Sequence, residues 1–141
     1  MANSDYAGDI LPQQAWAMLE QDARAQLIDV RTPAEWTYVG VPDLSSMGKE
    51  VKLIPWMLFP GMEFNSEFGE QLAKVTADHE APLLFLCRSG VRSRAAAVAA
   101  TRLGYRHCYN IGSGFEGVHD ASRHRGTVNG WKVDGLPWMQ G

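Results

Sequence analysis

A short, wholly apolar run that ends in a cysteine is the feature that most constrains the fold of this chain. Leu83-Leu84-Phe85-Leu86 precedes Cys87, and an alanine-rich helical pattern begins soon afterwards, at Val91. An uninterrupted apolar run of this length is typical of a strand buried on both faces, as in a parallel sheet. Other short apolar runs alternate with helical patterns along the chain, which predicts an α/β fold with a parallel sheet.

Five strands and four helices are expected from this alternation. The strands are predicted at residues 10–11, 26–30, 51–54, 82–87 and 108–111, and the helices at residues 12–21, 33–38, 65–78 and 91–103. Thr32 and Pro33 are the predicted N-cap and first residue of the second helix, and Gly104 is the predicted terminator of the last. Residues 40–49 are expected to form a loop. A single domain is predicted over residues 1–141, with its core at about 9–138.

Composition and charge exclude several classes of protein. The chain has 141 residues, of which 45% are hydrophobic, and a net charge of −3. These values are ordinary for a globular domain and unfavourable for nonspecific nucleic-acid binding. Two cysteines are too few for a disulfide framework or a zinc cluster. Since neither a signal peptide nor a membrane-spanning stretch is visible, we expect a cytoplasmic protein whose partners include no membrane and no nucleic acid.

The loop between the cysteine and the following helix has the composition of an anion site. Together with the first residues of that helix it reads Arg88-Ser89-Gly90-Val91-Arg92-Ser93, and it follows the carboxyl end of a strand, where α/β proteins place their ligands. Backbone N–H groups, a helix N-terminus and nearby cations favour a thiolate and can hold an anion joined to it. Arg92 and Arg94 fit poorly in the first turn of a helix unless an anion binds there. Cys87 is therefore a predicted nucleophile, rather than one of the small buried cysteines common in cores.

A second polar group follows the predicted strand at residues 26–30. Asp29 and Arg31 stand at the end of this strand, and Glu35 follows in the next helix. The favoured interpretation is structural, with an ion pair or capping interactions that fix the turn before Pro33. The alternative is that Asp29, with Arg31 beside it, orients the Cys87 loop through hydrogen bonds.

Two separate motifs, in the right order and spacing, give the chain a resemblance to the rhodanese superfamily. The segment from Leu27 to Trp36 resembles the early strand and turn of that family, and the segment from Cys87 to Ser93 resembles its active-site loop. Gly104-Tyr105, residues 108–111 and the ending Gly135-Leu136-Pro137-Trp138 extend the resemblance over nearly the whole chain. It implies a three-layer α/β/α fold with a mainly parallel five-stranded central sheet in the strand order 1-5-4-2-3.

The resemblance also implies sulfur transfer through a covalent intermediate. Cys87 would take the outer sulfur of a donor such as thiosulfate as a persulfide and pass it to cyanide, a thiol or a protein acceptor. The backbone N–H groups of residues 88–93 would cradle the persulfide, and Arg88 and Arg92 would bind the charged end of the donor. No cofactor and no metal is expected. The alternatives are a noncatalytic or redox-sensing module of the same fold and, less favoured, a cysteine phosphatase.

Loop length separates sulfur chemistry from phosphate chemistry. Four residues lie between Cys87 and Arg92, whereas cysteine phosphatases that resemble this family have a loop one residue longer, which suits a tetrahedral phosphate. The loop also contains no aspartate that could serve as a general acid. Both observations favour sulfur transfer.

Three further motifs are interpreted as structural. Residues 112–117 spell a dinucleotide-binding pattern, GSGFEG, but the remainder of the chain is too short for such a domain, so a glycine-rich turn near the active site is predicted. Cys108 is expected to be a buried strand residue rather than a resolving thiol. The cluster of His119, Asp120 and His124 is expected to form a polar loop rather than a metal site.

Two segments depart from the family pattern. A long polar loop at residues 40–50 replaces a short turn, and residues 55–62 are unusually apolar for a loop. The second segment is expected to be local core, with a hydrophobic rim for a protein partner or bulky acceptor as the alternative.

Overall fold

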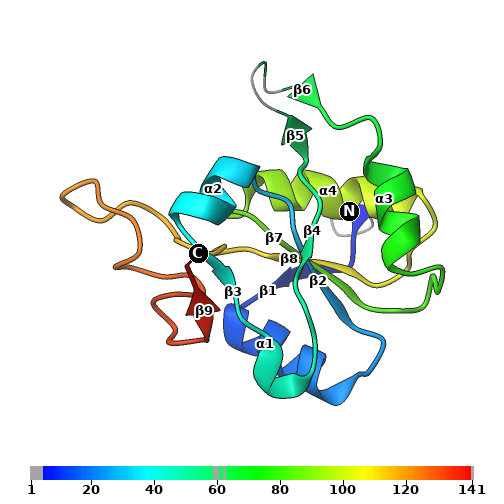
Figure 1. Cartoon of the computed structure of the whole chain (residues 1–141), viewed down its shortest axis with the longest axis horizontal. Helices are drawn as coiled ribbons and strands as arrows, with labels where there is room; N and C mark the ends of the chain where they lie inside the picture. Colours follow the sequence, from blue (N-terminus) through cyan, green and yellow to red (C-terminus); the bar gives the residue numbers. More distant parts are fainter. Residues whose placement is uncertain (1–4, 59–60, 62, 141) are drawn as a thin grey trace.

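The central sheet has five parallel strands in the order that the resemblance implied. The computed structural model describes residues 5–58, 61 and 63–140. The sheet order is β1-β8-β7-β2-β4, and every neighbouring pair is parallel. In chain order this is 1-5-4-2-3, so the predicted α/β fold is confirmed (Figure 1). The strands are β1 (Gly8–Ile10), β2 (Gln26–Asp29), β4 (Lys52–Leu53), β7 (Leu83–Leu86) and β8 (Cys108–Ile111).

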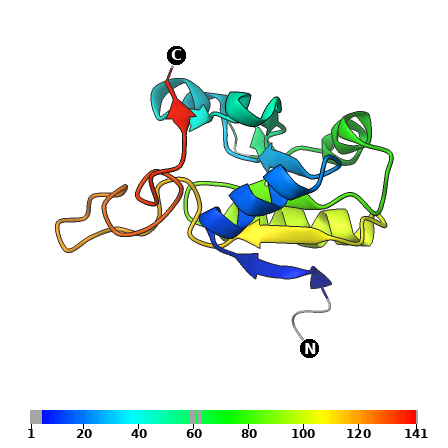
Figure 2. The same ribbon diagram turned by 90° about the horizontal axis from the view of Figure 1, so that it is seen from below.

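Helices cover both faces of this sheet, as Figures 1 and 2 show from two directions. On one face, α3 and α4 pack Leu72 and Ala96 against a core that contains Phe85. On the other face, α1 packs Leu19 into a core that contains Leu84. Leu84 and Phe85 are consecutive in β7, and strand alternation sends their side chains to opposite layers. The helices are α1 (Pro12–Gln21), α2 (Pro33–Tyr38), α3 (Phe68–Val75) and α4 (Val91–Arg102).

The pairing of β2 with β7 brings the predicted polar groups together at the carboxyl ends of the strands. The two strands pair along their whole length, with Asp29 opposite Leu86. Cys87 is the next residue after Leu86, so it lies at the same carboxyl edge as Asp29. All four residues of β7 are buried, and a cysteine that ends such a strand stands on a rigid support.

The short helix α2 begins with the cap that the sequence predicts. The Thr32 hydroxyl accepts a hydrogen bond from the Glu35 N–H, and the Glu35 carboxylate accepts one from the Thr32 N–H. Pro33 occupies the first helical position, where its fixed φ suits the helix and its missing N–H costs nothing. This reciprocal cap determines where the side chain of Glu35 lies.

The prediction of a continuous loop over residues 40–49 is wrong. Val41–Pro42 forms β3, which pairs antiparallel with β9 (Trp138–Met139), and Ser45–Met47 forms a 3-10 helix. Local sequence does not reveal this pairing, because glycine and proline near residue 41 are typical of turns and the partner strand lies near the other end of the chain. Other boundaries shift by a few residues: β1 begins earlier than predicted, and β4 and α3 are shorter.

The apolar segment 55–62 is core only in part. Trp56 packs edge to face on Phe68, with ring centres 5.1 Å apart, but Leu58 is 41% exposed. β5 (Met57–Leu58) and β6 (Glu63–Phe64) form an antiparallel pair that projects from the body of the molecule (Figure 1). The prediction of local core therefore fits Trp56 and fails for Leu58. Phe59, Pro60 and Met62 lie outside the described residues.

The segment near the C-terminus closes the face of the sheet that α1 covers. Trp131 is completely buried there and packs edge to face on Trp16 at 5.9 Å. Its indole N–H donates a hydrogen bond to the Pro137 carbonyl. Trp131 therefore seals this side of the core, whereas Trp138 lies in β9 and is 40% exposed. In the described part of the chain, no helix has the length and apolar character needed to cross a membrane.

Candidate active site

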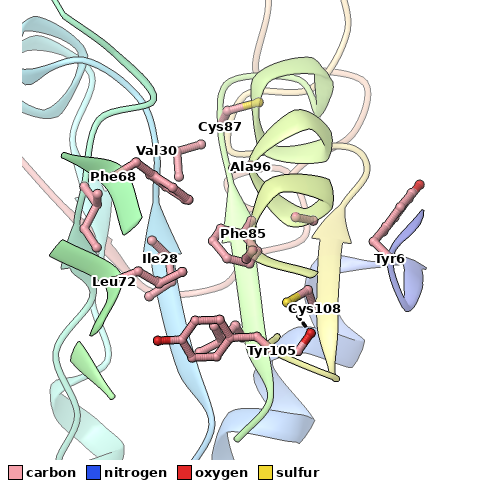
Figure 3. Packing of buried hydrophobic residues seen from close by; sticks show 14 residues of the cluster. Tyr6, Ile28, Val30, Phe68, Leu72, Phe85, Cys87, Ala96, Tyr105 and Cys108 are labelled. Carbon is pink, nitrogen blue, oxygen red and sulfur yellow. Dashed lines mark hydrogen bonds between the residues drawn. The ribbon is translucent and has the colours of Figure 1, made fainter. Parts of the chain in front are cut away.

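Cys87 directly follows β7, the central strand, and its sulfur is turned toward the first turn of α4 (Figure 3). The residue is 1% exposed. Its Sγ accepts hydrogen bonds from the backbone N–H groups of Gly90, at 3.1 Å, and Ser93, at 3.3 Å. The Ser93 hydroxyl oxygen lies 3.2 Å from the same sulfur. Two N–H donors at a helix N-terminus stabilise negative charge on the sulfur or on an anion bound to it.

The tight turn that aims these donors depends on Gly90. This residue precedes α4 and has a φ of +103°, a conformation that L side chains rarely adopt. A Cβ at this position would collide with the carbonyl oxygen of Gly112. Glycine is thus required both for the backbone conformation and for the space that the turn occupies.

The glycine-rich turn predicted at residues 112–117 packs directly behind the cysteine loop. The N–H of Phe115 donates to the Cys87 carbonyl at 2.8 Å, and the N–H groups of Glu116 and Gly117 donate to the Arg88 carbonyl. A Cβ on Gly114 would collide with that same Arg88 carbonyl. The prediction of a turn close to the active site is confirmed. The loop can direct its carbonyl groups away from the sulfur because this turn supplies donors for them.

Arg92 is held in place by α2. Its two terminal nitrogens donate to the two carboxylate oxygens of Glu35 at 2.6 and 2.9 Å, the two-pronged geometry typical of this pair. Burial disfavours the charge on Glu35, but the hydrogen bonds and charge of Arg92 outweigh burial and lower the pKa of this carboxyl. The hydrogen bonds of Glu35 raise the pKa of Arg92 in turn, and negative charge on Cys87 adds to that effect. The sequence assigned Glu35 a structural role but did not reveal its partner.

Asp29 and Arg31 form a second ion pair, which is completely buried. Arg31 donates from Nη2 to the Asp29 carboxylate at 2.6 Å and to the Gly40 carbonyl at 2.7 Å. Its guanidinium also lies 4.3 Å from the centre of the Phe115 ring. The side-chain hydrogen bonds found for Asp29 all go to Arg31, which agrees with the structural interpretation. Contact with the Cys87 loop is indirect, through Phe115, so a loop-orienting role stays a prediction.

The other loop residues differ in their exposure to solvent. Arg88 is exposed, Ser89 is half-buried and Val91 is 78% exposed. Arg88 therefore faces solvent. Binding of a charged sulfur donor by Arg88 and Arg92 stays a prediction. A donor on Arg92 would have to share the guanidinium with the Glu35 carboxylate.

Cys108 lies too far from Cys87 to act as its resolving thiol. Cys108 stands opposite Leu83, at the start of β7, whereas Cys87 follows the end of that strand. Four residues of strand separate the two levels by about 13 Å, and a disulfide needs Cα atoms within about 7 Å. Figure 3 shows the two cysteines at opposite ends of the core cluster. Cys108 is a buried strand residue, as predicted.

The polar cluster near residue 120 shapes an exposed loop. The Asp120 carboxylate accepts hydrogen bonds from the N–H groups of Ser122 and His124 and from the Thr127 hydroxyl. His119 and His124 are exposed. These contacts account for Asp120 by turn formation and fit the interpretation as a polar loop.

Asn110, a buried polar residue near Cys87, was not predicted from the sequence. Asn110 is 3% exposed within β8, and its side chain contacts Ser93 and Asp9. The signal was present, because a polar residue inside an otherwise apolar strand needs a buried partner. The sequence did not say that the partner would be Ser93, in the segment that follows Cys87.

Comparison with known proteins assigns the chain to a family. A family model described as "STR4 middle domain" matches residues 8–141. The thiosulfate sulfurtransferase GlpE of Actinobacillus pleuropneumoniae serotype 5b (strain L20) is 26% identical over 92% of this chain and 90% of that relative. The chain belongs to the STR4 middle domain family, within the rhodanese superfamily. The resemblance inferred from the two sequence motifs is thus confirmed.

Other relatives of this rhodanese-superfamily chain extend over the same length. The "Uncharacterized protein RP600 homolog" of Rickettsia rickettsii is 39% identical over 93% of this chain and 96% of the relative. The crystal structure of Rv0390 from M. tuberculosis has a TM-score of 0.88 and 50% identity, covering 96% of this chain and 99% of that one. The polysulfide-sulfur transferase homodimer of Wolinella succinogenes has a TM-score of 0.66 at 24% identity, covering 99% and 82%. At that identity the last comparison shows a shared fold.

Proposed function

We propose that this chain is a sulfurtransferase that carries sulfur on Cys87 as a persulfide. The observation that supports this most directly is the pair of backbone N–H groups, from Gly90 and Ser93, that point at Sγ. Donors fixed before the reaction stabilise developing charge without the cost of reorganising solvent. Arg92, held by Glu35, places a guanidinium group in the first turn of α4. The relative GlpE, described as a thiosulfate sulfurtransferase, supports the same class of reaction.

The proposed reaction has two steps. In the first, the Cys87 thiolate attacks the outer sulfur of thiosulfate, an S–S bond forms to Sγ, and the S–S bond of the donor breaks to release sulfite with its electron pair. In the second, a nucleophile such as cyanide attacks the outer sulfur of the persulfide, and Sγ leaves as the thiolate. Charge and sulfur balance in each step, so the residues of the loop need no cofactor and no metal.

The geometry favours a small donor. Cys87 is 1% exposed, so a bulky donor would have to displace the loop to bring its sulfur within reach. We propose an anionic donor of the size of thiosulfate, guided by Arg88 at the mouth. The acceptor proposed is a thiol, cyanide or a protein thiol.

Intact-protein mass spectrometry after incubation with thiosulfate tests the proposal. The wild-type protein should gain the mass of one sulfur atom and lose it again when cyanide is added. Cys87→Ser should gain nothing. Cys108→Ser is the matched control, because it removes the other buried cysteine at a distance from the loop and should be loaded like wild type.

Two results would contradict the proposal. One is a wild-type protein that gains no sulfur from thiosulfate, polysulfide or mercaptopyruvate while Cys87 is oxidised by peroxide, which would favour a redox-sensing module. The other is Cys87-dependent hydrolysis of a phosphate ester that exceeds sulfur transfer, which would favour a phosphatase.

A further inference from the structure

A chain of hydrogen bonds runs from the catalytic sulfur to the protein surface. The Ser93 hydroxyl lies 3.2 Å from Sγ of Cys87 and donates to Oδ1 of Asn110 at 2.5 Å. Nδ2 of Asn110 donates to Asp9 at 3.0 Å, and the Tyr6 hydroxyl donates to the same Asp9 oxygen at 2.7 Å. Cys87, Ser93 and Asn110 are buried, whereas Asp9 is exposed.

The direction of the bonds in this chain is fixed by Asn110. Its Nδ2 faces two acceptors, the Asp9 carboxylate and the Gly90 carbonyl, the latter at 3.2 Å. A flipped amide would place its oxygen against both acceptors and lose both hydrogen bonds. Asp9 and Asn110 also stand opposite each other in the β1–β8 pairing, so the backbone holds them in register. Oδ1 of Asn110 therefore has to face Ser93.

This fixed orientation of Asn110 determines where the single proton of the Ser93 hydroxyl points. A hydroxyl donates one hydrogen bond, and the short bond to Asn110 uses it. A lone pair of Ser93 then faces Cys87, which suits an S–H group that donates to it. A thiolate in the same place keeps its two N–H donors but receives no proton from Ser93. Asn110 and the thiolate compete for one proton.

We propose that Asn110, locked by Asp9 and the Gly90 carbonyl, withholds the Ser93 hydroxyl from Cys87 and thereby tunes the ionisation and nucleophilicity of the sulfur. Asn110 and Asp9 are positioning residues, since neither touches Sγ. A thiolate with fewer hydrogen bonds is scarcer at a given pH but attacks faster once formed. The inference deepens the proposed function, because it concerns the same sulfur.

The charged groups around this chain of hydrogen bonds come from α2, α4, β1 and the end of β2. Arg92 of α4 lies near Cys87 and is paired with Glu35 of α2, and the Asp29–Arg31 pair closes the end of β2. On the outer side, Arg94 lies 5.8 Å from the Tyr6 ring, next to Asp9. Burial, followed by the hydrogen bond to Asp9, raises the pKa of Tyr6, so Tyr6 remains a donor to Asp9. Substitution of Asn110 leaves all these charges unchanged.

The pH dependence of the alkylation of Cys87 by iodoacetamide tests the proposal with a double-mutant cycle. Asn110→Leu removes the competing acceptor, so Ser93 can donate to the thiolate. One hydrogen bond to a charged group should lower the midpoint of the alkylation profile by about one pH unit. The limiting rate at high pH should fall about threefold, because the stabilised thiolate is a weaker nucleophile. In the Ser93→Ala background the same Asn110→Leu change should move neither quantity.

Two further variants separate this effect from damage to the fold. Asn65→Leu is the matched control, because Asn65 is another buried asparagine, 2% exposed, with hydrogen bonds to Pro55 and Gln71. It should leave the alkylation midpoint unchanged. Asp9→Ala, at an exposed position, loosens the lock on Asn110 and should shift the midpoint in the same direction by a smaller amount, even if Asn110→Leu fails to fold.

The proposal is overturned if Asn110→Leu or Asp9→Ala leaves the midpoint unchanged or raises it. It is also overturned if Asn110→Leu causes an equal shift when Ser93 is alanine, since the effect would then not pass through the hydroxyl. Alkylation requires no sulfur donor. The inference can therefore fail while thiosulfate still loads Cys87, and it can succeed even if thiosulfate does not.

Discussion

Cys87 and Cys108 lie on neighbouring strands of the same sheet and are both buried, at 1% and 0% exposure, yet their surroundings are opposite in polarity. Cys108 lies at the start of β8, where its S–H points at the Tyr105 carbonyl at 3.6 Å. Cys87 lies beyond the end of β7, where two N–H groups point at its sulfur. Burial raises the pKa of Cys108 to about 11. The backbone groups that face the sulfur, rather than its depth, distinguish the two positions.

Cys87 and Cys108 lie at opposite ends of the parallel sheet, Cys87 at the carboxyl ends of the strands and Cys108 at the amino ends. The carboxyl ends of the strands lead into helix N-termini, which present N–H groups, and the amino ends receive chain from helix C-termini, which present carbonyl groups. A cysteine at the first end faces donors and one at the second faces acceptors. The same side chain is therefore suited to catalysis at one end and to packing at the other.

The largest expected difference is in the alkylation of the two thiols. At pH 7 in the folded protein, iodoacetamide should label Cys87 at least about a hundred times faster than Cys108, because a thiol with a pKa of about 11 has roughly one thiolate in ten thousand. Peptide mass spectrometry after timed labelling measures both rates. In denaturant the two rates should converge, and equal rates in the folded protein would remove the basis of the comparison.

Gly90→Ala should have the second largest effect, because it disturbs the two N–H donors that face the sulfur of Cys87. The new Cβ would collide with Gly112, so the loop has to move and its N–H groups turn away from the sulfur. We expect sulfur loading from thiosulfate to slow by about a hundredfold, as for the loss of an oxyanion donor. Gly48→Ala is the control, since Gly48 also has a positive φ, +71°, but its Cβ would meet nothing within 4 Å. That variant should load normally.

Arg92→Ala removes the cation and should have a smaller effect. A lost charge-assisted contact to the donor lowers kcat/KM for thiosulfate about tenfold, mainly through KM. Arg102→Ala changes an exposed arginine at the far end of α4 and should leave kcat/KM unchanged. If both variants retain wild-type kcat/KM, Arg92 serves to join α4 to α2 and does not bind the donor.

The smallest effect should be on stability at acid pH. The pKa of Glu35 is lowered in the folded state, so its contribution is fully present above the pKa of the unfolded chain, about 4.3. It is lost as the pH falls through the lower folded value. Denaturant unfolding between about pH 5 and pH 3 should show wild type losing of order 1 kcal/mol more stability than Glu35→Gln. Equal losses would mean that the Arg92 pair contributes nothing to stability.

The parts of this protein that could be predicted from sequence are those with a local cause. The uninterrupted apolar run of β7, the cap at Thr32 and Pro33, and the glycine before α4 each act within a few residues. Their elements were placed within a few residues of where they lie. The position of Cys87 at the carboxyl end of a buried strand followed from the same local pattern.

What could not be predicted depends on contacts between distant segments. The β3–β9 pair joins residues near 41 and 139, and nothing in either segment indicates the other. The same is true of Glu35, which pairs with Arg92 of another helix, and of Asp9, which contacts Asn110 on the neighbouring strand. Charge and polarity in the sequence marked each residue as needing a partner but did not say which one.

The depth of Cys87 gives the two halves of the proposed reaction different size limits. A sulfur added to Sγ extends the side chain by about 2 Å, and the added atom is the one that the acceptor has to reach. The donor must bring its sulfur to the buried Sγ of Cys87, whereas the acceptor needs to reach only the outer sulfur of the persulfide. A domain built this way would be strict about what gives it sulfur and tolerant of what takes the sulfur away.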